Sequence, residues 1–454
     1  WLPPLVRGEQ LAAFALTEPE AGSDAANVQT TATPSADGSH FMLNGEKRYI
    51  TSGGIAQVLT VMARTPVRRD DTLVAQNESV TKVSPLPDET AITAFLVTPD
   101  MPGFSVPEPR MEKLGIRGTA TARLAFRDMP VPTENILGAQ GKGLKLALTV
   151  LDFGRTTFGA CCTGAAKTCL RLAVQHANAR RQFGRTLGEF ELIKKKIARM
   201  AAGAYAMEAM TTVTASLIDR GLGDYMLETA MLKVFTTEAL WQLVNDSFQL
   251  HGGAAYFTDK PLERMLRDAR INQIGEGANE VLTSFIALVG MRAPGEQLRD
   301  LLDALQNPWG EWRKAWLLGL DRVGAAVRAP EVPVRSPHLE PYAKRLAELI
   351  RHFNVDVDRA LIRHREEILE RQYVQERIAR AAMELFACAC VLSRRDAELG
   401  AGGVDASHDG AAHSAAELFL RGSFRRARRS LAEMHENDDE AVTAVADSVL
   451  RHGP

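Results

Sequence analysis

Glu276 is a carboxylate in an unusual local setting, within the segment RDARINQIGEGANEV (residues 267–281). It lies between Gly275 and Gly277, in a short break between two stretches whose apolar residues recur at helical spacing. A carboxylate in such a break either caps the following helix or serves as a general base for proton removal. Taken alone, the position favours the cap, and both interpretations stay open at this point.

A second polar segment, FALTEPEAGSD (residues 14–24), has the composition of a binding turn. An extended run enters a turn in which glycine allows close approach to the backbone, while Thr17, Ser23 and Asp24 offer short polar side chains. Such a turn can hold a phosphate group or the polar edge of a ring. An ordinary β-turn is the alternative interpretation.

A third segment, ARRQFG (residues 179–184), ends a predicted helix with the adjacent arginines Arg180 and Arg181. Arginines at a helix C-terminus commonly satisfy the last carbonyl groups and interact favourably with the helix dipole. The alternative is that they pair with a phosphate group, which the planar guanidinium suits.

The elements that must position these segments fall into two regions. The first 135 residues contain short apolar and β-branched runs, and Asn44-Gly45 predicts a hairpin turn between two strands. Residues 66–90 are polar and aperiodic, which indicates a surface loop. From about Gly143 the apolar residues recur at helical spacing. The long helices predicted after this first one cover residues 190–221, 223–252 and 278–291.

A break at residues 292–298 separates these helices from a further helical region. Helices are predicted there over 297–325, 338–399 and 414–451, with a Pro-rich linker at 327–337 and a flexible connection at 400–413. The predicted fold class is α+β and multidomain. It comprises a small β-barrel or orthogonal β-sheet domain (1–135), an antiparallel four-helix bundle (136–292) and an all-α C-terminal extension (293–454).

The composition excludes several classes of protein. The 54 basic and 56 acidic residues nearly balance, which argues against a nucleic-acid-binding protein. The five cysteines lack zinc-ligand spacing and are too few for a disulfide framework, so we expect no metal site and a reducing compartment. No apolar run reaches the roughly 18 residues of a membrane-spanning helix. The chain opens at Trp1 without a signal peptide, so we expect that an N-terminal portion is missing.

Several motifs occur together in the order and spacing of the acyl-CoA dehydrogenase family, which the chain resembles over residues 1 to about 291. They are ALTEPEAGSD, NGEKRYITSGG, ARRQFG, QLHGGAAYF and RDARINQIGEGANEV. The segments NILGAQGKGLKLALTVLDFGR and LIKKKIARMA and the helical extension are most similar to the very-long-chain branch. The resemblance implies FAD-dependent dehydrogenation of a long-chain fatty acyl-CoA to the trans-2-enoyl-CoA in β-oxidation, with an electron-transfer flavoprotein as acceptor.

The resemblance also implies where FAD binds, between the β-domain and the helix bundle. The residues implied for the same subunit are Phe14, Leu16 and Thr17 at the isoalloxazine ring, Gly22 and Ser23 at the pyrophosphate, and Tyr49, Ile50 and Thr51 beside the flavin. Those implied to reach the FAD of a neighbouring subunit are Arg180, Gln182 and Phe183, with Gln249 and Gly253 on the adenosine side. Ala278 and Glu280 complete the implied cofactor-binding set. A homodimer follows from this arrangement.

Glu276 aligns with the catalytic base of the family. Burial should raise the pKa of its carboxyl group, while its backbone N–H and a flavin ribityl hydroxyl stabilise the enolate that forms at the thioester. Some branches place the base at the position of Gly154, where glycine cannot act, so Glu276 is the remaining candidate. The implied substrate contacts are Ser23, Asp152, Arg155, Gly275 and Gly277. For Asp152 and Arg155, a helix-start aspartate and a structural ion pair are the alternative.

Three departures from the family pattern lie at the site. Gly275 replaces an aromatic residue and thins the pocket wall, Ala278 replaces a threonine that contacts FAD, and Tyr49 replaces a tryptophan. The family also places an N-terminal helical domain before the β-domain, and we expect this domain to be the portion that is missing before Trp1.

Two other functions stay open: an acyl-CoA oxidase that uses O₂, and a non-catalytic assembly or binding scaffold on the same fold. The arginine run FRRARRS (residues 424–430) is a solvated helix face or a peripheral contact with anionic lipid. The expected location is cytoplasmic for a bacterial protein and mitochondrial for a eukaryotic one, either soluble or peripherally bound to a membrane.

Overall fold

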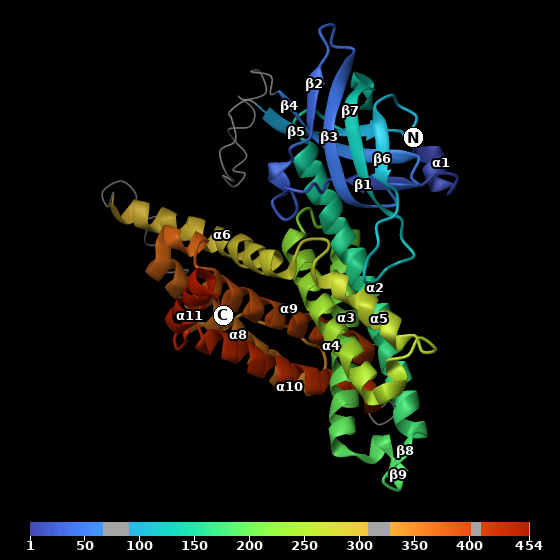
Figure 1. Ribbon diagram of the computed structural model, residues 1–454. Helices are drawn as coiled ribbons and strands as arrows, with labels where there is room; N and C mark the ends of the chain where they lie inside the picture. The colour runs from blue at the N-terminus through green and yellow to red at the C-terminus, as the bar shows by residue number, and fades with distance from the viewer. Residues whose placement is uncertain (67–89, 307–326, 401–409, 454) are drawn as a thin grey trace. The chain divides into compact units, whose positions relative to one another are not determined.

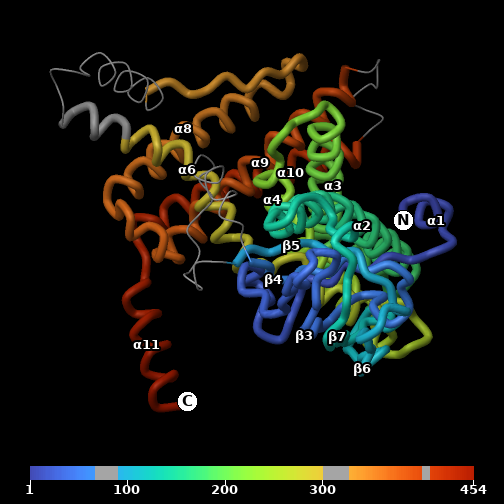
Figure 2. Tube along the Cα trace, turned by 90° about the horizontal axis from the view of Figure 1, so that it is seen from above, coloured from blue at the N-terminus to red at the C-terminus, as the bar shows by residue number. Residues whose placement is uncertain are grey.

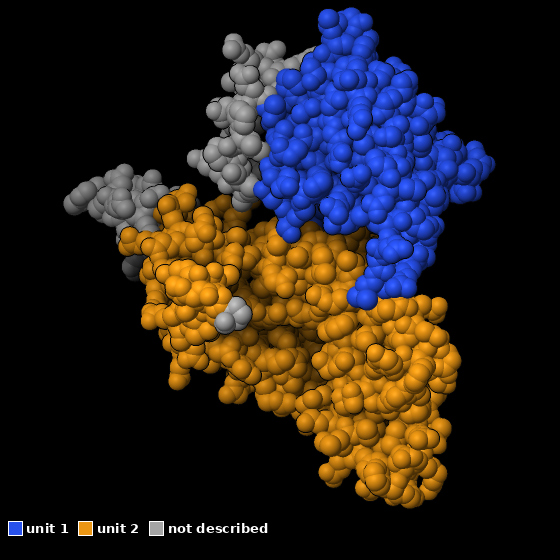
Figure 3. All heavy atoms as spheres, viewed as in Figure 1, with its two compact units in different colours: residues 1–153 blue, residues 154–454 orange. Residues whose placement is uncertain are grey.

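The computed structural model describes residues 1–66, 90–306, 327–400 and 410–453. Contacts between residues divide the chain into two compact units, Trp1–Phe153 and Gly154–Pro454 (Figure 3). The predicted surface loop over 66–90 lies outside the described residues, apart from its two ends, which belong to strands.

Unit 1 is built on a curled sheet, as the β-rich pattern predicts (Figure 1). After the short helix α1 (Leu2–Val6), the sheet's strands in the described residues are β1 (Ala12–Ala15), β2 (Thr31–Pro34), β3 (His40–Thr51), β4 (Val58–Pro66), β5 (Thr90–Val97), β6 (Phe104–Glu108) and β7 (Thr121–Pro132). The strand order is β1-β4-β2-β3-β7-β6, with β5 also paired to β4. Leu43, Phe95 and Leu124 are fully buried in its core.

The hairpin predicted at Asn44-Gly45 is wrong, because both residues lie inside the continuous strand β3. The register between β3 and β7 shifts at this point, which marks a β-bulge. Gly45 has φ +150°, and a Cβ there would lie 2.5 Å from Thr30 Oγ1, so only glycine fits. Asn44 Oδ1 accepts a hydrogen bond from the Asp128 N–H at 2.8 Å. The Asn-Gly pair therefore bends a strand instead of reversing the chain.

Unit 2 is mostly helical, and its long helices confirm the predicted pattern (Figure 1). The long helix α2 begins in unit 1 and continues into unit 2. The helices of the described residues are α2 (Gly143–Ala179), α3 (Glu191–Asp219), α4 (Met226–His251), α5 (Leu262–Arg270), α6 (Asn279–Gln306), α8 (Glu340–His364), α9 (Gln372–Gly400), α10 (Gly410–Ala432) and α11 (Asp439–His452). A two-stranded hairpin, β8 (Arg181–Gln182) and β9 (Arg185–Thr186), follows α2. In the described part of the chain, no helix combines the length and apolar composition needed to cross a membrane.

The predicted break at 292–298 is wrong, because α6 continues through Pro294. An internal proline costs a helix about 3 kcal/mol. Burial offsets this cost, since Ile286 and Met291 on α6 pack in one hydrophobic cluster with Leu361 of α8. Two predicted helices are interrupted instead: 338–399 between α8 and α9, and 414–451 between α10 and α11.

The contacts do not separate the predicted C-terminal extension from the helices before it, because they share one hydrophobic core. Tyr205 and Met210 of α3 pack in the same cluster as Leu346, Val391 and Phe419, which lie on α8, α9 and α10. The tube view in Figure 2 likewise shows α9 and α10 beside α3 and α4.

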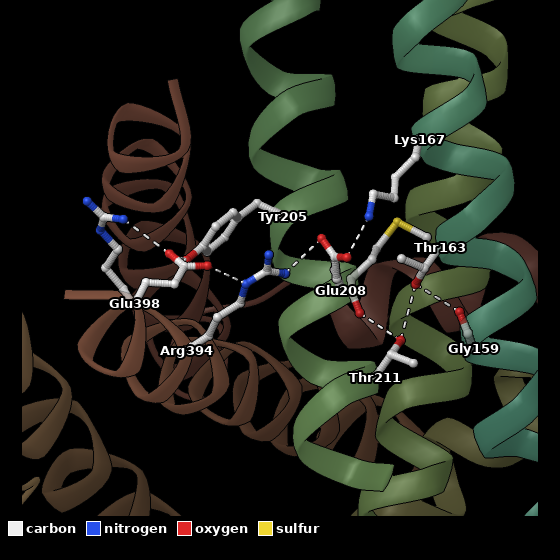
Figure 4. A network of polar contacts seen from close by, with 10 residues as sticks. Gly159, Thr163, Lys167, Tyr205, Glu208, Thr211, Arg394 and Glu398 are labelled. Atoms are coloured by element: carbon white, nitrogen blue, oxygen red, sulfur yellow. Dashed lines mark hydrogen bonds and ion pairs between the residues drawn. The ribbon is translucent and has the colours of Figure 1, made fainter. Parts of the chain in front are cut away.

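A polar network also crosses this part of unit 2 (Figure 4). Glu208 of α3 binds Lys167 of α2 at 2.5 Å and Arg394 of α9 at 2.8 Å. Arg394 in turn binds Glu398 at 2.8 Å, and Tyr205 donates a hydrogen bond to the same carboxylate at 2.8 Å. Helices far apart in the sequence are thus joined by charge as well as by packing.

Candidate active site

The loop that carries Glu276 joins the 3₁₀ turn η7 (Ile271–Gln273) to helix α6. Glu276 has φ +59° and Gly277 has φ +91°, so two successive residues adopt left-handed conformations. For a residue other than glycine this costs about 1–3 kcal/mol and is typical of functional sites. The first turn of α6 closes with the Leu282 N–H bound to the Ala278 carbonyl, which makes Ala278 the N-cap. Glu276 lies two residues earlier, so the cap interpretation is wrong.

Two buried cations hold this loop by its carbonyl groups. Lys233 of α4 has no exposed surface, and its Nζ donates to Gly277 O at 2.7 Å and to Asn279 Oδ1 at 2.8 Å. Arg155 of α2 donates from Nε to Glu276 O at 3.5 Å. These contacts fix two successive carbonyl groups of the backbone that directly follow the Glu276 Cα. Within the described residues, the Glu276 N–H has no acceptor, so it is available to a ligand.

Lys233 is the functional candidate that the sequence analysis missed. The sequence offers little signal, because the residues on the same helical face at 229, 230, 236 and 237 are three threonines and an alanine, and their burial is seen only in the structure. A lysine at the centre of a buried helical face requires a partner, since an unpaired buried charge is costly. Its partners lie more than 40 residues later in the chain, so the sequence pattern did not identify them.

The pKa of Glu276 is raised above its ordinary value. Burial is the main cause, and the positive charges of Arg155 and Lys233 oppose it. Glu276 is exposed as a residue, yet enough protein surrounds its carboxylate to reduce hydration and set the direction of the shift. Burial also lowers the pKa of Lys233, to about 8, so this lysine remains mostly charged at neutral pH.

Gly154 lies beside the same carboxylate. A Cβ built on Gly154 would stand 3.6 Å from Glu276 Oε2, which is an ordinary van der Waals contact. The position at which some branches carry the base is therefore adjacent to Glu276. Asp152 and Arg155 lie on the same helix α2 and are both buried, with 5% and 7% exposure.

Gly275 leaves space near the base. A Cβ on Gly275 would find the Ile271 carbonyl oxygen as its nearest atom, at 3.7 Å, and its φ is not positive. A side chain would therefore fit there without strain. Ala278 is half-buried and Glu280 is exposed, and they lie two and four residues after Glu276.

In unit 1, a buried ion pair brings two predicted cofactor-binding segments together. Lys47 Nζ binds Glu18 Oε1 at 2.6 Å and Leu16 O at 3.0 Å, with both charged side chains almost fully buried. The Arg48 N–H donates to Thr17 O at 2.9 Å. Residues 14–18 and 47–51 consequently lie side by side. The sequence motifs point to other residues on both segments and give no sign of Glu18 and Lys47, which fix the two segments to each other.

The carboxylate of Glu18 is strongly hydrogen-bonded as well as paired. It accepts the N–H groups of Gln29 at 2.5 Å and Thr30 at 3.1 Å. Burial alone would raise the pKa of Glu18, but the charge and hydrogen bond of Lys47, together with those two residues, hold it below the ordinary value. The pair is therefore charged at neutral pH.

The exposure of the predicted cofactor-binding residues in unit 1 divides them into two groups. The exposed or half-exposed ones are Phe14, Thr17, Gly22, Ser23, Tyr49 and Thr51. Leu16 and Ile50 are only 7% and 2% exposed, so they can offer a ligand little beyond their backbone groups. Tyr49 adopts φ +62° at the end of β3, which turns the strand at this surface.

The third predicted set lies far from Glu276. Arg180, Gln182 and Phe183 follow the C-terminal end of α2, and Phe183 is 93% exposed. Gly154 and Ala179 are separated by about 37 Å along this helix at 1.5 Å per residue. Gln249 and Gly253, at the end of α4, are exposed too. One chain does not bring these residues to the Glu276 loop.

Comparison with known proteins assigns most of the chain. Residues 13–129 match the family model described as acyl-CoA dehydrogenase, middle domain, and residues 141–290 match acyl-CoA dehydrogenase, C-terminal domain. Residues 337–454 match a third model, ACAD9/ACADV, C-terminal domain. The chain belongs to the acyl-CoA dehydrogenase family.

Individual relatives support this assignment. The mitochondrial very long-chain specific acyl-CoA dehydrogenase of Homo sapiens is 35% identical over 90% of this chain, and the chain spans 61% of the length of that relative. The structure of an acyl-CoA dehydrogenase complexed with FAD from Bacillus anthracis is 28% identical, with a TM-score of 0.78 over 98% of this chain and 73% of that chain. Butyryl-CoA dehydrogenase from Megasphaera elsdenii is 34% identical, with a TM-score of 0.57 over 64% and 71% of the two chains.

Proposed function

We propose that the protein dehydrogenates a fatty acyl-CoA between the α and β carbons, with Glu276 as the base. The observation that carries this proposal is the strained Glu276 loop, which Lys233 and Arg155 hold by two successive carbonyl groups. A thioester α-C–H is a very weak acid, so a carboxylate with a raised pKa is better matched to it than an ordinary one.

The proposed reaction removes two hydrogens and forms one C=C bond. Glu276 accepts the α-hydrogen as a proton, and the C–H electron pair becomes part of the new double bond. The Glu276 N–H is positioned to donate to the thioester oxygen as negative charge develops there, a contribution of roughly 3 kcal/mol for one such donor. FAD, when bound, supplies the acceptor for the β-hydrogen, which departs as a hydride.

The residues of unit 1 fit the binding of FAD. The hydroxyl groups of Thr17, Ser23 and Thr51 are exposed or half-exposed, and so is the ring of Tyr49. A Cβ on Gly22 would meet nothing within 4 Å, so the backbone there is open to a phosphate group. The buried pair of Glu18 and Lys47 preorganises this surface. Ala278 offers no hydroxyl group from the Glu276 loop.

A homodimer is part of the proposal. Arg180, Gln182 and Phe183 are exposed and stand about 37 Å along α2 from the Glu276 loop. We infer that they serve the FAD of a second subunit, together with Gln249 and Gly253. Phe183 supports this, since its aromatic side chain is 93% exposed next to Gln182 and is therefore available to a second subunit.

A long acyl chain is the proposed substrate. The relatives differ in this respect, because one is named for very long chains and another for butyryl-CoA. The first matches 90% of this chain, and residues 337–454 match a C-terminal model named for ACAD9/ACADV. Gly275 adds open space beside the base.

The proposed acceptor is an electron-transfer flavoprotein, with O₂ as the alternative. A peripheral membrane contact through residues 424–430 has weaker support. Arg426 is paired with Glu384 at 2.5 Å and Arg429 with Glu433 at 2.7 Å, so half of the arginines there are already neutralised.

Anaerobic titration of the full-length, FAD-loaded protein with acyl-CoAs of increasing length tests the proposed function. We expect bleaching of the flavin absorbance, fastest with long chains. The bleached protein should then reduce an electron-transfer flavoprotein faster than it consumes O₂. Absence of bleaching with every chain length would favour the scaffold, and preferential O₂ consumption would favour the oxidase.

A further inference from the structure

A cluster of two histidines and a glutamate lies on the C-terminal helices of unit 2. His413 and Glu417 are four residues apart on α10, which places them on one face of the helix. His338 comes from the 3₁₀ turn η8 (Pro337–Leu339), at the end of the Pro-rich segment. Residues more than 70 positions apart are thus brought together at one point. The Glu276 chemistry uses none of them.

The three donor atoms have the spacing of a metal site. Glu417 Oε1 lies 3.2 Å from His338 Nε2 and 3.6 Å from His413 Nε2. The ligand atoms of all three residues lie within 4.8 Å of one another. Tetrahedral zinc with bonds of about 2.1 Å separates its donors by roughly 3.4 Å. The two edges that meet at Glu417 are close to this value, and the third edge, between the two histidines, is at most 4.8 Å long.

The Glu417 carboxylate is oriented for this role by a neighbouring arginine. Arg421 Nη2 donates to Glu417 Oε2 at 3.3 Å and to Tyr342 Oη at 3.2 Å. Arg421 thus engages Oε2, while Oε1 faces the histidines, and outer partners commonly orient a metal ligand in this way.

We propose that His338, His413 and Glu417 bind a zinc ion that ties η8 to α10. Two imidazoles and one carboxylate form a common protein ligand set for zinc, with water in the fourth position. Apart from the histidines, Arg421 is the one positive side chain that is seen to bind Glu417 within the described residues. Its charge lowers the affinity of the site for zinc, but it leaves Oε1 accessible because it contacts Oε2. The ion stabilises the fold of the C-terminal helices, and the dehydrogenation chemistry does not require it.

Zinc binding to the full-length protein tests this proposal. After chelation with EDTA, the protein is titrated with Zn²⁺ against a competing fluorescent chelator, and Co²⁺ is used separately for its visible absorption. We expect one Zn²⁺ per chain at this site, a rise in Tm with Zn²⁺, and a Co²⁺ spectrum typical of tetrahedral coordination. The variants His338→Gln, His413→Gln and Glu417→Gln should each lose the Co²⁺ spectrum and the rise in Tm.

His452→Gln is the matched control, because it removes an exposed histidine on α11 outside the cluster. It should bind Zn²⁺ as the wild type does. A variant is taken as folded if its FAD content and circular dichroism spectrum match those of the wild type. If a histidine variant does not fold, Glu417→Gln still tests the proposal, because glutamine keeps the size and shape of the glutamate side chain. The proposal is overturned if the wild type binds no Zn²⁺. In that case the three residues form only a hydrogen-bonded cluster of two histidines and a glutamate. Zn²⁺ binding that survives in the double variant His338→Gln/His413→Gln also overturns it.

Discussion

Lys233 is the residue through which the bundle controls Glu276. Its ammonium group holds the Gly277 carbonyl and contributes a positive charge that lowers the pKa of Glu276. A base acts only when deprotonated, so activity is lost as pH falls through that pKa. Removing the charge in Lys233→Met raises the pKa of Glu276, and we expect the acid limb of the pH–rate profile to move to higher pH.

The rate of anaerobic flavin reduction measured across pH distinguishes this role from a structural one. Truncation also leaves the Gly277 carbonyl without its donor, at about 1–3 kcal/mol of stability. If the rate falls equally at every pH and the midpoint does not move, Lys233 is only structural. Lys167→Met is the control, since Lys167 pairs with Glu208 at a half-exposed position away from the loop.

Gly154 offers a second test of the same geometry. Its Cβ would lie 3.6 Å from Glu276 Oε2, so a glutamate there can reach the same region. Glu276→Gly removes the base and also suits the left-handed φ of +59°. We expect the double variant Gly154→Glu/Glu276→Gly to recover part of the flavin reduction that Glu276→Gly loses. A double variant that binds FAD normally but is no faster than the single variant would argue against this placement.

Among the elements, β3 is joined to the segment that follows β1 by the buried pair of Glu18 and Lys47. Breaking a buried pair by removing one partner costs about 3–5 kcal/mol, whereas replacing both is often close to neutral. We expect Lys47→Met to lower the free energy of unfolding and to weaken FAD binding. The double variant Lys47→Met/Glu18→Leu should lose less stability, which denaturant unfolding measures. A double variant that loses the sum of the losses measured for Lys47→Met and Glu18→Leu alone would mean that the pair contributes no coupling.

The same pair predicts a pH dependence of stability. The folded pKa of Glu18 lies below its unfolded value, so its contribution is present above the unfolded pKa and is lost as pH falls through the folded pKa. Acidification below about pH 4.5 should therefore destabilise the wild type more than Glu18→Gln.

Much of the element order could be predicted from the sequence, because periodicity is a local property. The long helices and the β-rich start were found in this way. Asn44-Gly45 and Pro294 were misread, because bulge formation and burial against distant helices overrode a local signal. In the candidate site, too, local features could be predicted and long-range contacts could not. The glycines around Glu276 marked it locally, whereas Lys233, Glu18 and Lys47 act through partners 29 to 46 positions away.

For the molecule as a whole, unit 2 should unfold cooperatively, since α3, α4, α8, α9 and α10 share one core. Phe419 of α10 is 5% exposed and packs edge-to-face on Phe235 of α4, with ring centroids 6.0 Å apart. Phe419→Ala should cost about 3–5 kcal/mol. We expect helix content and tryptophan fluorescence to report one transition, shifted to lower denaturant. Two separate transitions, with only one shifted, would show that the C-terminal region folds independently.

The central claim is that Glu276 removes the α-proton, and the rate of flavin reduction in Glu276→Gln tests it most directly. Glutamine keeps the size of the side chain and the loop contacts of Lys233 and Arg155, which are made to backbone carbonyls and Asn279. FAD content should therefore be unchanged. With a long-chain acyl-CoA under anaerobic conditions, we expect bleaching to slow by about 10²–10⁴-fold, the typical contribution of a general base. Reduction at the wild-type rate would contradict the assignment.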